Sequence, residues 1–277
     1  MQPLLDTVSA LRPVGLDRAD PSATARRRVD RKYLVDPATV VELVASLDTG
    51  WRVLEIDGGR LLPYDNVYFD TADRRLHHAA VQRKRRRVKV RTRRYGADEH
   101  APVVVEAKHK GVRGETLKER RAVVADAHGD PTGALDGSDE AGALLASLGV
   151  TADGLLPAIH TSYRRLTLVG PDGTRVTIDV DVVCENDHGR VVFGDLIVET
   201  KSPGPPTEAD RFLWGRGVRP LRLSKCSTPL SMLEPECGGN RWHRTVGRHD
   251  IRLEASGRGT SASEAQVPNT DGAGSSS

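Results

Sequence analysis

Charged and apolar residues alternate along a short segment in the first half of the chain. Residues 83–94 are Arg-Lys-Arg-Arg-Arg-Val-Lys-Val-Arg-Thr-Arg-Arg. In a strand, alternate side chains share a face, whereas a helix would scatter these cations around its circumference. The pattern therefore predicts a strand with one face packed on a core and the other face against a polyanion. The cationic face would carry Arg87, Lys89, Arg91 and Arg93, and the opposite face Val88, Val90 and Thr92.

The same alternation recurs in six further segments. In an ordinary antiparallel sheet the charged face would be the outer surface, in contact with water. Carboxylates and cations are mixed at high density on so many successive segments that we favour a sheet closed around one water-filled lumen. The residues that would share this face are Asp30 and Lys32; Glu106, Lys108 and Lys110; Lys118 and Arg120; Tyr163, Arg165 and Thr167; Arg175, Thr177, Asp179 and Asp181; Glu199 and Lys201.

Helical periodicity is found between some of these strands. Asp36 followed by Pro37 is typical of a helix start, and the apolar residues that follow recur at helical spacing up to Leu47. Thr207 is predicted to cap a second helix that runs to about Trp214. We expect an insertion at residues 126–150, with a short helix around 141–148.

Composition favours one domain with unstructured ends. The chain has 277 residues, of which 38% are hydrophobic and 29% charged, as expected for a single domain of about 200 residues. Residues 1–25 and 236–277 lack sustained periodicity and are predicted to be disordered. The folded domain is predicted to span residues 26–235.

Charge and cysteine content narrow the functional class. The net charge is only +3, so the basic run is a local feature, which argues against a protein that wraps nucleic acid. The three cysteines form no CxxC pair, which favours a reducing compartment and argues against structural zinc. No stretch approaches the ~20 apolar residues that span a bilayer. We expect a cytoplasmic protein without a membrane segment.

Arginine on the predicted cationic strand suits phosphate. Its planar guanidinium offers several donors that match phosphate oxygens and stays charged at any relevant pH. Lys89, Arg91 and Arg93 would therefore bind successive phosphates, whereas 83–86 would be a solvated or partner-binding run. The alternative is a nucleic-acid surface, but only 4% of residues are aromatic, which counts against base stacking.

Two glutamates precede a lysine by two positions, in Glu106-Ala-Lys108 and Glu199-Thr-Lys201. On a strand this spacing places each carboxylate beside an ammonium group, usually as a salt bridge. In a lumen the carboxylate could instead bind a divalent cation while the lysine binds phosphate. A site of hard oxygen ligands suits Mg²⁺ or Mn²⁺.

Nine short motifs resemble, in order, those of the VTC domain. This is the polyphosphate polymerase domain of the vacuolar transporter chaperone, a branch of the triphosphate tunnel metalloenzymes, which also include the CYTH proteins. The resemblance covers roughly residues 26–235. The motifs are RRVDRKYLV (27–35), NVYFDT (66–71), VKVRTRRYG (88–96), VVVEAKHK (103–110), LKERRAV (117–123), SYRRLTL (162–168), RVTID (175–179), LIVETK (196–201) and LSKC (223–226).

The resemblance implies an α+β fold built on a closed antiparallel eight-stranded β tunnel with flanking helices. It implies a catalytic set of Arg91, Arg93, Lys108 and Glu199. Glu199, assisted by Glu106, would bind Mn²⁺ or Mg²⁺. The remaining substrate-binding positions would be Lys32, Lys118, Tyr163, Arg165, Arg175, Arg222 and Lys225. The alternation adds Lys89 and Lys201 to them.

The predicted function is polyphosphate synthesis from ATP. Where the hydrolytic CYTH proteins have Glu-x-Glu-x-Lys, this chain has Arg28 and Asp30 before Lys32, which weakens the case for a two-metal hydrolase. A triphosphatase acting on triphosphate or polyphosphate stays open as an alternative, since it would need the same clamp. So does a non-catalytic module that binds polyphosphate or nucleic acid, although nucleic acid is the less favoured partner. No protein partner is predicted.

Overall fold

The structure is a computed structural model. It describes residues 1–19, 29–96, 98, 101–110, 116–123, 131–135, 138–171, 173–238 and 240–255. Arg28 lies outside these ranges, as do residues 256–277. Within these ranges, no helix has both the length and the apolar character needed to cross a bilayer.

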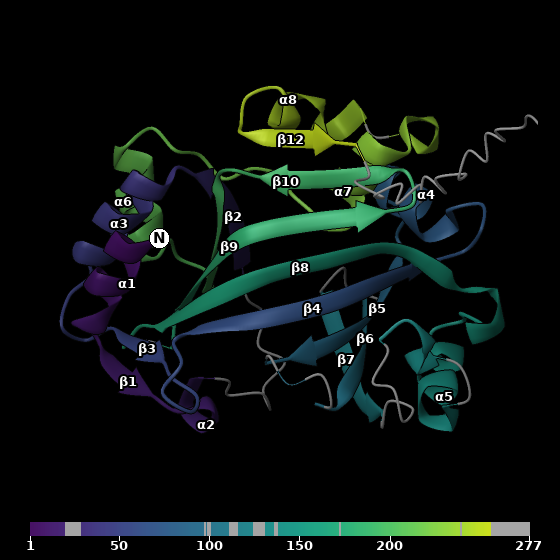
Figure 1. The fold of residues 1–277 in the computed structure, drawn as a ribbon, viewed down its shortest axis with the longest axis horizontal. Coiled ribbons are helices and arrows are strands. Elements are labelled where there is room, and N and C mark those ends of the chain that lie inside the picture. Colours follow the sequence, from purple (N-terminus) through teal and green to yellow (C-terminus); the bar gives the residue numbers. More distant parts are fainter. Residues whose placement is uncertain are drawn as a thin grey trace, which may run out of the picture.

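A single curved, mainly antiparallel sheet dominates the fold (Figure 1). One path runs β12-β10-β9-β8-β4-β5-β6-β7, while β11 pairs with β9 and β2, and β3 pairs with β8 and, in parallel, with β1. The strands are β1 (Arg12–Val14), β2 (Val29–Val35), β3 (Arg52–Leu54), β4 (Leu61–Asp70), β5 (Val88–Tyr95), β6 (Val103–Lys110), β7 (Thr116–Val123), β8 (Leu156–Val169), β9 (Arg175–Asn186), β10 (Gly189–Phe193), β11 (Leu196–Ser202) and β12 (Ile251–Glu254).

The prediction of an antiparallel sheet is confirmed, but the prediction of a closed eight-stranded tunnel is wrong in two respects. The sheet has 12 strands, and it is not closed, because β2 and β7 do not pair with each other in the described ranges. The edge of β2 that does not pair with β11 is instead bordered by an irregular segment. The backbone N–H of Leu221 donates a hydrogen bond to the carbonyl oxygen of Lys32 at 2.8 Å.

Helices cover the outer, apolar face of the sheet (Figure 1). α1, α3 and α6 lie together beside β2 and β3, α5 lies near β6 and β7, and α4 and α7 lie at the far end of β4. The helices are α1 (Gln2–Ser9), α2 (Leu16–Ala19), α3 (Pro37–Ala45), α4 (Arg75–Val81), α5 (Asp139–Ser147), α6 (Glu208–Gly215), α7 (Ser227–Leu233) and α8 (His243–Val246).

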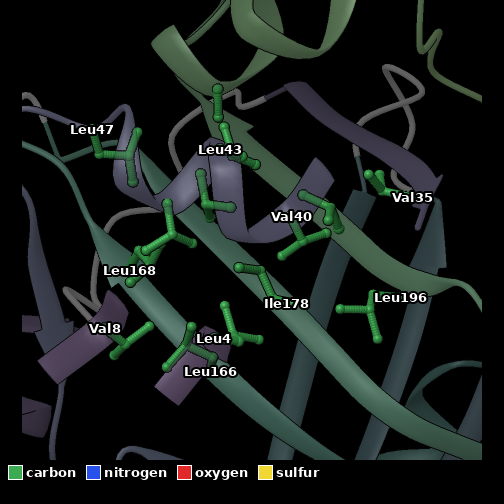
Figure 2. Close-up of a cluster of buried hydrophobic side chains, with 14 of the residues drawn as sticks. Leu4, Val8, Val35, Val40, Leu43, Leu47, Leu166, Leu168, Ile178 and Leu196 are labelled. Atoms are coloured by element: carbon green, nitrogen blue, oxygen red, sulfur yellow. The ribbon is translucent and has the colours of Figure 1, made fainter. Parts of the chain in front are cut away.

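The largest apolar cluster lies between these helices and the strands β2, β8, β9 and β11 (Figure 2). Leu43 of α3 packs there with Leu168 and Ile178, and all three side chains are buried. Leu4 and Val8 of α1 belong to the same cluster. Disorder over residues 1–25 is therefore wrong for residues 2–19, since α1 supplies part of the core.

A second cluster covers the outer face of β5 and β6. Val90 and Val105 pack there against Leu144 and Leu145 of α5. The predicted insertion at 126–150 thus includes a helix that buries the apolar side of the cationic strand. At the other end of the chain, β12 pairs with β10, so residues 251–254 are also structured, contrary to the prediction of disorder from 236 onward.

Two predicted helix starts are confirmed. Asp36 accepts a hydrogen bond from the N–H of Thr39 at 2.9 Å and so caps α3, with Pro37 in its first turn. Thr207 and Asp210 form a reciprocal capping box at the start of α6. Asp210 also accepts hydrogen bonds from Tyr33 and Thr200, which attaches α6 to β2 and β11.

Candidate functional site: a cationic cavity on the concave face of the sheet

The polar faces of the strands line one cavity of about 1030 Å³. Eleven of its lining residues are lysine or arginine and six are aspartate or glutamate, so positive charge is in excess. The prediction that these faces converge is confirmed even though the sheet is open. The predicted site residues that line the cavity are Lys32, Lys89, Arg91, Arg93, Glu106, Lys108, Lys118, Arg165, Arg175, Glu199, Lys201 and Lys225.

Strand β5 owes its orientation to its alternating sequence. Val88, Val90 and Thr92 are buried on the outer face, and Thr92 Oγ1 donates a hydrogen bond to the carbonyl oxygen of Pro131 at 2.8 Å. Lys89, Arg91 and Arg93 consequently face the cavity. Arg87 precedes the strand and does not continue the row, because its guanidinium bonds to the carbonyl oxygen of Lys84 at 2.8 Å.

Glu106 of β6 is surrounded by cations from the strands on both sides. Its register partners are Arg91 of β5 and Arg120 of β7. One carboxylate oxygen accepts bonds from Arg91 Nε at 2.7 Å and lies 3.9 Å from Arg93 Nη1. The other lies 2.5 Å from Lys118 Nζ and 3.1 Å from Arg120 Nε. Burial alone would raise the pKa of Glu106, but Arg91, Arg93 and Lys118 hold it well below its usual value.

Glu199 of β11 lies on the opposite wall with fewer partners. Thr200 donates a hydrogen bond to Asp210 of α6 on the outer face, so Glu199 and Lys201 point into the cavity. Lys201 Nζ lies 3.1 Å from the Glu199 carboxylate. Burial would raise the pKa of Glu199, but Lys201, Lys32 and then Arg165 hold it well below its usual value. Glu199 is therefore ionised and faces the cavity.

Side chains from β6 on one side of the cavity and from β2 and β11 on the other approach one another near Glu199. Lys108 of β6 lies across the cavity from β2 and β11. Burial lowers the pKa of Lys108, the ammonium group of Lys32 lowers it further, and Glu199 opposes the shift. Among the described residues, the hydrogen bond made by Lys32 Nζ is a long one, 3.5 Å to the carbonyl oxygen of Leu223. These two lysines thus keep donor capacity for an incoming anion.

Asp179 joins two further cations. Arg165 Nε and Nη2 bond to its two carboxylate oxygens at 2.6 and 2.9 Å, and Lys225 also bonds to it. Burial raises the pKa of Asp179, but Arg165 and Lys225 lower it well below its usual value. The carboxylate therefore holds Arg165 and Lys225 in place as their counter-ion.

Tyrosines support the cations. Arg93, only 4% exposed, donates to Asn66 Oδ1 at 2.6 Å and to the hydroxyl of Tyr163 at 2.9 Å. Tyr163 stacks on Tyr64 with ring centroids 5.2 Å apart, and the guanidinium of Arg165 lies over both rings. The prediction had included Tyr163 alone. Tyr64 shares the alternation of its strand with Asn66 and Tyr68, which is the signal that could have identified it.

Some predicted residues lie elsewhere. Arg222 is exposed and does not line the cavity, and Tyr163 acts beneath the lining through Arg93. Asp181 forms an exposed ion pair with Arg164. Conversely, Ser224 lines the cavity without having been predicted, and so does Arg120, which was predicted to share the lumen face but not to bind substrate or metal.

Glu199 fits a divalent cation better than Glu106 does. Both oxygens of Glu106 already contact cations, whereas Glu199 forms an ion pair with Lys201 alone within the described ranges. In the described part of the chain, three potential ligands meet at Glu234, Glu236 and Cys237, and none of these lines the cavity. A metal ion at Glu199 would therefore take its remaining ligands from phosphate oxygens and water, as Mg²⁺ commonly does.

Comparison with known proteins gives the family. Among solved structures, a candidate adenylate cyclase from Bacillus halodurans is similar at 16% identity and a TM-score of 0.47, over 72% of this chain and 94% of that chain. A candidate adenylyl cyclase from Hippeastrum, described as having a dominant triphosphatase activity, is similar at 19% identity and a TM-score of 0.43, over 70% and 89%.

Both TM-scores lie below 0.5, so the assignment rests on sequence. No curated protein matches the chain. The family model of the VTC domain matches residues 27–234, which is most of the chain and nearly the whole predicted domain. The chain therefore belongs to the VTC domain family.

Proposed function

We propose that the protein transfers the γ-phosphoryl group of a nucleoside triphosphate, ATP by preference, to the end of a polyphosphate chain. One observation carries the proposal: Lys32, Lys108 and Glu199 converge from opposite walls of a cavity lined by many more cations. Cations fixed in this way stabilise negative charge on the transferred group without reorganising during the reaction.

In the proposed reaction, a terminal oxygen of the chain forms a bond to the γ-phosphorus atom. The bond from that atom to the bridging oxygen breaks, so that a nucleoside diphosphate leaves and the chain grows by one phosphate. Arg165 and Lys225 orient the phosphates, since Asp179 fixes both side chains. Lys32 and Lys108 offer donors to the transferred group. When bound at Glu199, Mg²⁺ or Mn²⁺ would supply additional positive charge at the phosphate oxygens.

Hydrolysis is the competing reaction, because water could replace the chain as acceptor. Incubation of the purified protein with ATP and Mn²⁺ distinguishes the two. We expect phosphate chains that are visible on a gel, with little free phosphate, and loss of both products when the metal is chelated. Free phosphate without chains would identify a triphosphatase. If neither product forms, the enzymatic proposal fails and a binding module is favoured.

A further inference from the structure

Three arginines from separate parts of the chain form a cluster outside the cavity, which we call the outer arginine cluster: Arg87, Arg222 and Arg241. Arg87 precedes β5, Arg222 lies between α6 and α7, and Arg241 lies in the short helix Asn240–Trp242. Burial lowers the pKa of Arg241, and the charges of Arg222 and Arg87 lower it further. The contacts agree with this proximity, because Arg241 and Arg87 bond to the carbonyl oxygens of Ala80 and Lys84, four residues apart at the end of α4.

The outer arginine cluster adjoins one end of the cavity. Lys89 lines the cavity two residues after Arg87, and its Nζ lies 2.6 Å from the hydroxyl of Ser224, two residues after Arg222. Arg241 is among the cations that, after burial, lower the pKa of Lys89 to about 8. A series of cations therefore runs from the interior through Lys89 to the cluster.

Two of the three arginines are held in place by backbone oxygens. Arg241 Nη1 donates to the carbonyl oxygen of Ala80 at 2.6 Å, and Arg87 Nη1 donates to that of Lys84 at 2.8 Å. No member of the outer arginine cluster forms an ion pair with a carboxylate of the described ranges, and the buried Nε of Arg241 has no hydrogen-bond partner. Neighbouring cations without counter-ions are unfavourable. Their arrangement fits a ligand that carries several negative charges.

The other end of the cavity has a different character. Strand β5 runs between the two ends, and from Lys89 to Tyr95 it spans roughly 20 Å. α2 and β3 supply lining residues at the far end, and these two elements lie on the other side of the molecule from α4 and α7 (Figure 1). This end mixes carboxylates and apolar side chains with the cations Arg175 and Lys201, which are register partners at the strand end that β3 joins. Its lining residues include Leu16, Asp17, Leu54, Ile56, Asp57 and Asp98.

We propose that the outer arginine cluster binds the part of a polyphosphate chain that extends from the cavity past Lys89. The identity of the ligand rests on the proposed function. The new element is that the affinity of the protein depends on the length of the polyphosphate chain. A triphosphate would occupy the cavity alone, whereas a long chain would also reach the cluster. Single-stranded RNA fits less well, because Trp242 is buried beneath Arg241 and offers no face for base stacking.

The test compares long-chain inorganic polyphosphate with tripolyphosphate in equilibrium binding to the full chain. For Arg87→Gln combined with Arg241→Gln, we expect affinity for the long chain to fall about tenfold or more. The salt dependence should also weaken by about one unit of slope for each arginine removed. Affinity for tripolyphosphate should stay within about twofold, because the cavity is intact. Arg216→Gln is the matched control, because it removes a charge directly after α6 that pairs with Glu42 and does not line the cavity.

Equal loss for both ligands, or no loss for either, would overturn the proposal. Arg87→Gln alone gives a second test if the double variant folds poorly, since the hydrogen bonds of the Arg87 side chain within the described ranges go to backbone oxygens. A loss confined to a single-stranded RNA probe would assign the cluster to nucleic acid instead. These binding results are independent of turnover. If the wild-type protein consumes no ATP, the proposed function is wrong, but the binding measurements still show whether the outer arginine cluster binds long-chain polyphosphate.

Discussion

Glu106 and Glu199 occupy the same sequence motif but different environments. Each glutamate lies two residues before a lysine on a central strand and faces the same cavity. Glu106 contacts Arg91, Lys118 and Arg120 within 3.1 Å. Glu199 contacts Lys201 at 3.1 Å. The first carboxylate is an internal counter-ion, whereas the second keeps capacity for a ligand.

The neighbouring strands cause this difference. β6 lies between β5 and β7, and both place an arginine opposite Glu106. β11 lies between β2 and β9, which place Lys32 and Thr177 opposite Glu199. The partners of a residue in a sheet depend on register as well as on its own motif. A local motif therefore does not distinguish a structural carboxylate from a metal ligand.

The largest expected effect is on stability, from Glu106→Gln. The substitution leaves several cations of the β5–β7 wall without their counter-ion, and loss of one partner of a buried pair costs about 3–5 kcal/mol. We expect the free energy of unfolding, measured by urea denaturation, to fall by that amount. Because bound anions can replace the lost charge, tripolyphosphate should raise the melting temperature of this variant more than that of the wild type.

The matched comparison is Glu199→Gln, measured in the same way. Its stability should change by less than about 2 kcal/mol, because fewer cations depend on Glu199. If the two variants lose similar stability, Glu106 neutralises the surrounding cations no more than Glu199 does, and the proposed difference between the two sites is wrong.

The second expected effect is on turnover. Glu199→Gln should lower metal-dependent turnover roughly 100-fold or more, since it removes the carboxylate that we assign to the metal ion. Initial rates over a Mn²⁺ titration would measure the change. Glu42→Gln is the control, because Glu42 is half exposed and pairs with Arg216 away from the cavity. Normal turnover of Glu199→Gln would remove the metal assignment.

The alternation along each strand predicted which side chains share a face. It did not predict where strands begin, how α1 packs or whether the sheet closes. The alternation at 88–93 correctly placed Lys89, Arg91 and Arg93 on one face. It could not show that the strand begins at Val88, which leaves Arg87 outside the cavity. Nor could it show that α1 packs on the core, because that depends on contacts with α3, far along the chain. A closed sheet was inferred from the mixed charges of successive strands, and its eight-stranded form from resemblance. An irregular segment at Leu221 borders the β2 edge instead.

The smallest expected effect is a dependence of ATP affinity on pH, which arises from Lys89 and not from Glu106 or Glu199. The pKa values of Glu106 and Glu199 are lowered, so both stay ionised above pH 7. Burial, together with Lys32 and Lys108, lowers the pKa of Lys89 to about 8. As the pH rises through 8, the free protein loses this positive charge, and its affinity for ATP should fall by about tenfold between pH 7 and 9.

Lys89→Met isolates this contribution, because protonation of ATP itself is the same for both proteins. The variant should bind ATP more weakly at pH 7 and lose affinity less steeply towards pH 9. Since a bound anion favours the charged ammonium group, the wild type should also take up more protons on binding near pH 8.5 than the variant. Calorimetry in two buffers of different ionisation enthalpy measures this uptake. Identical pH profiles would mean that other lysines titrate in this range and that Lys89 does not cause the loss of affinity.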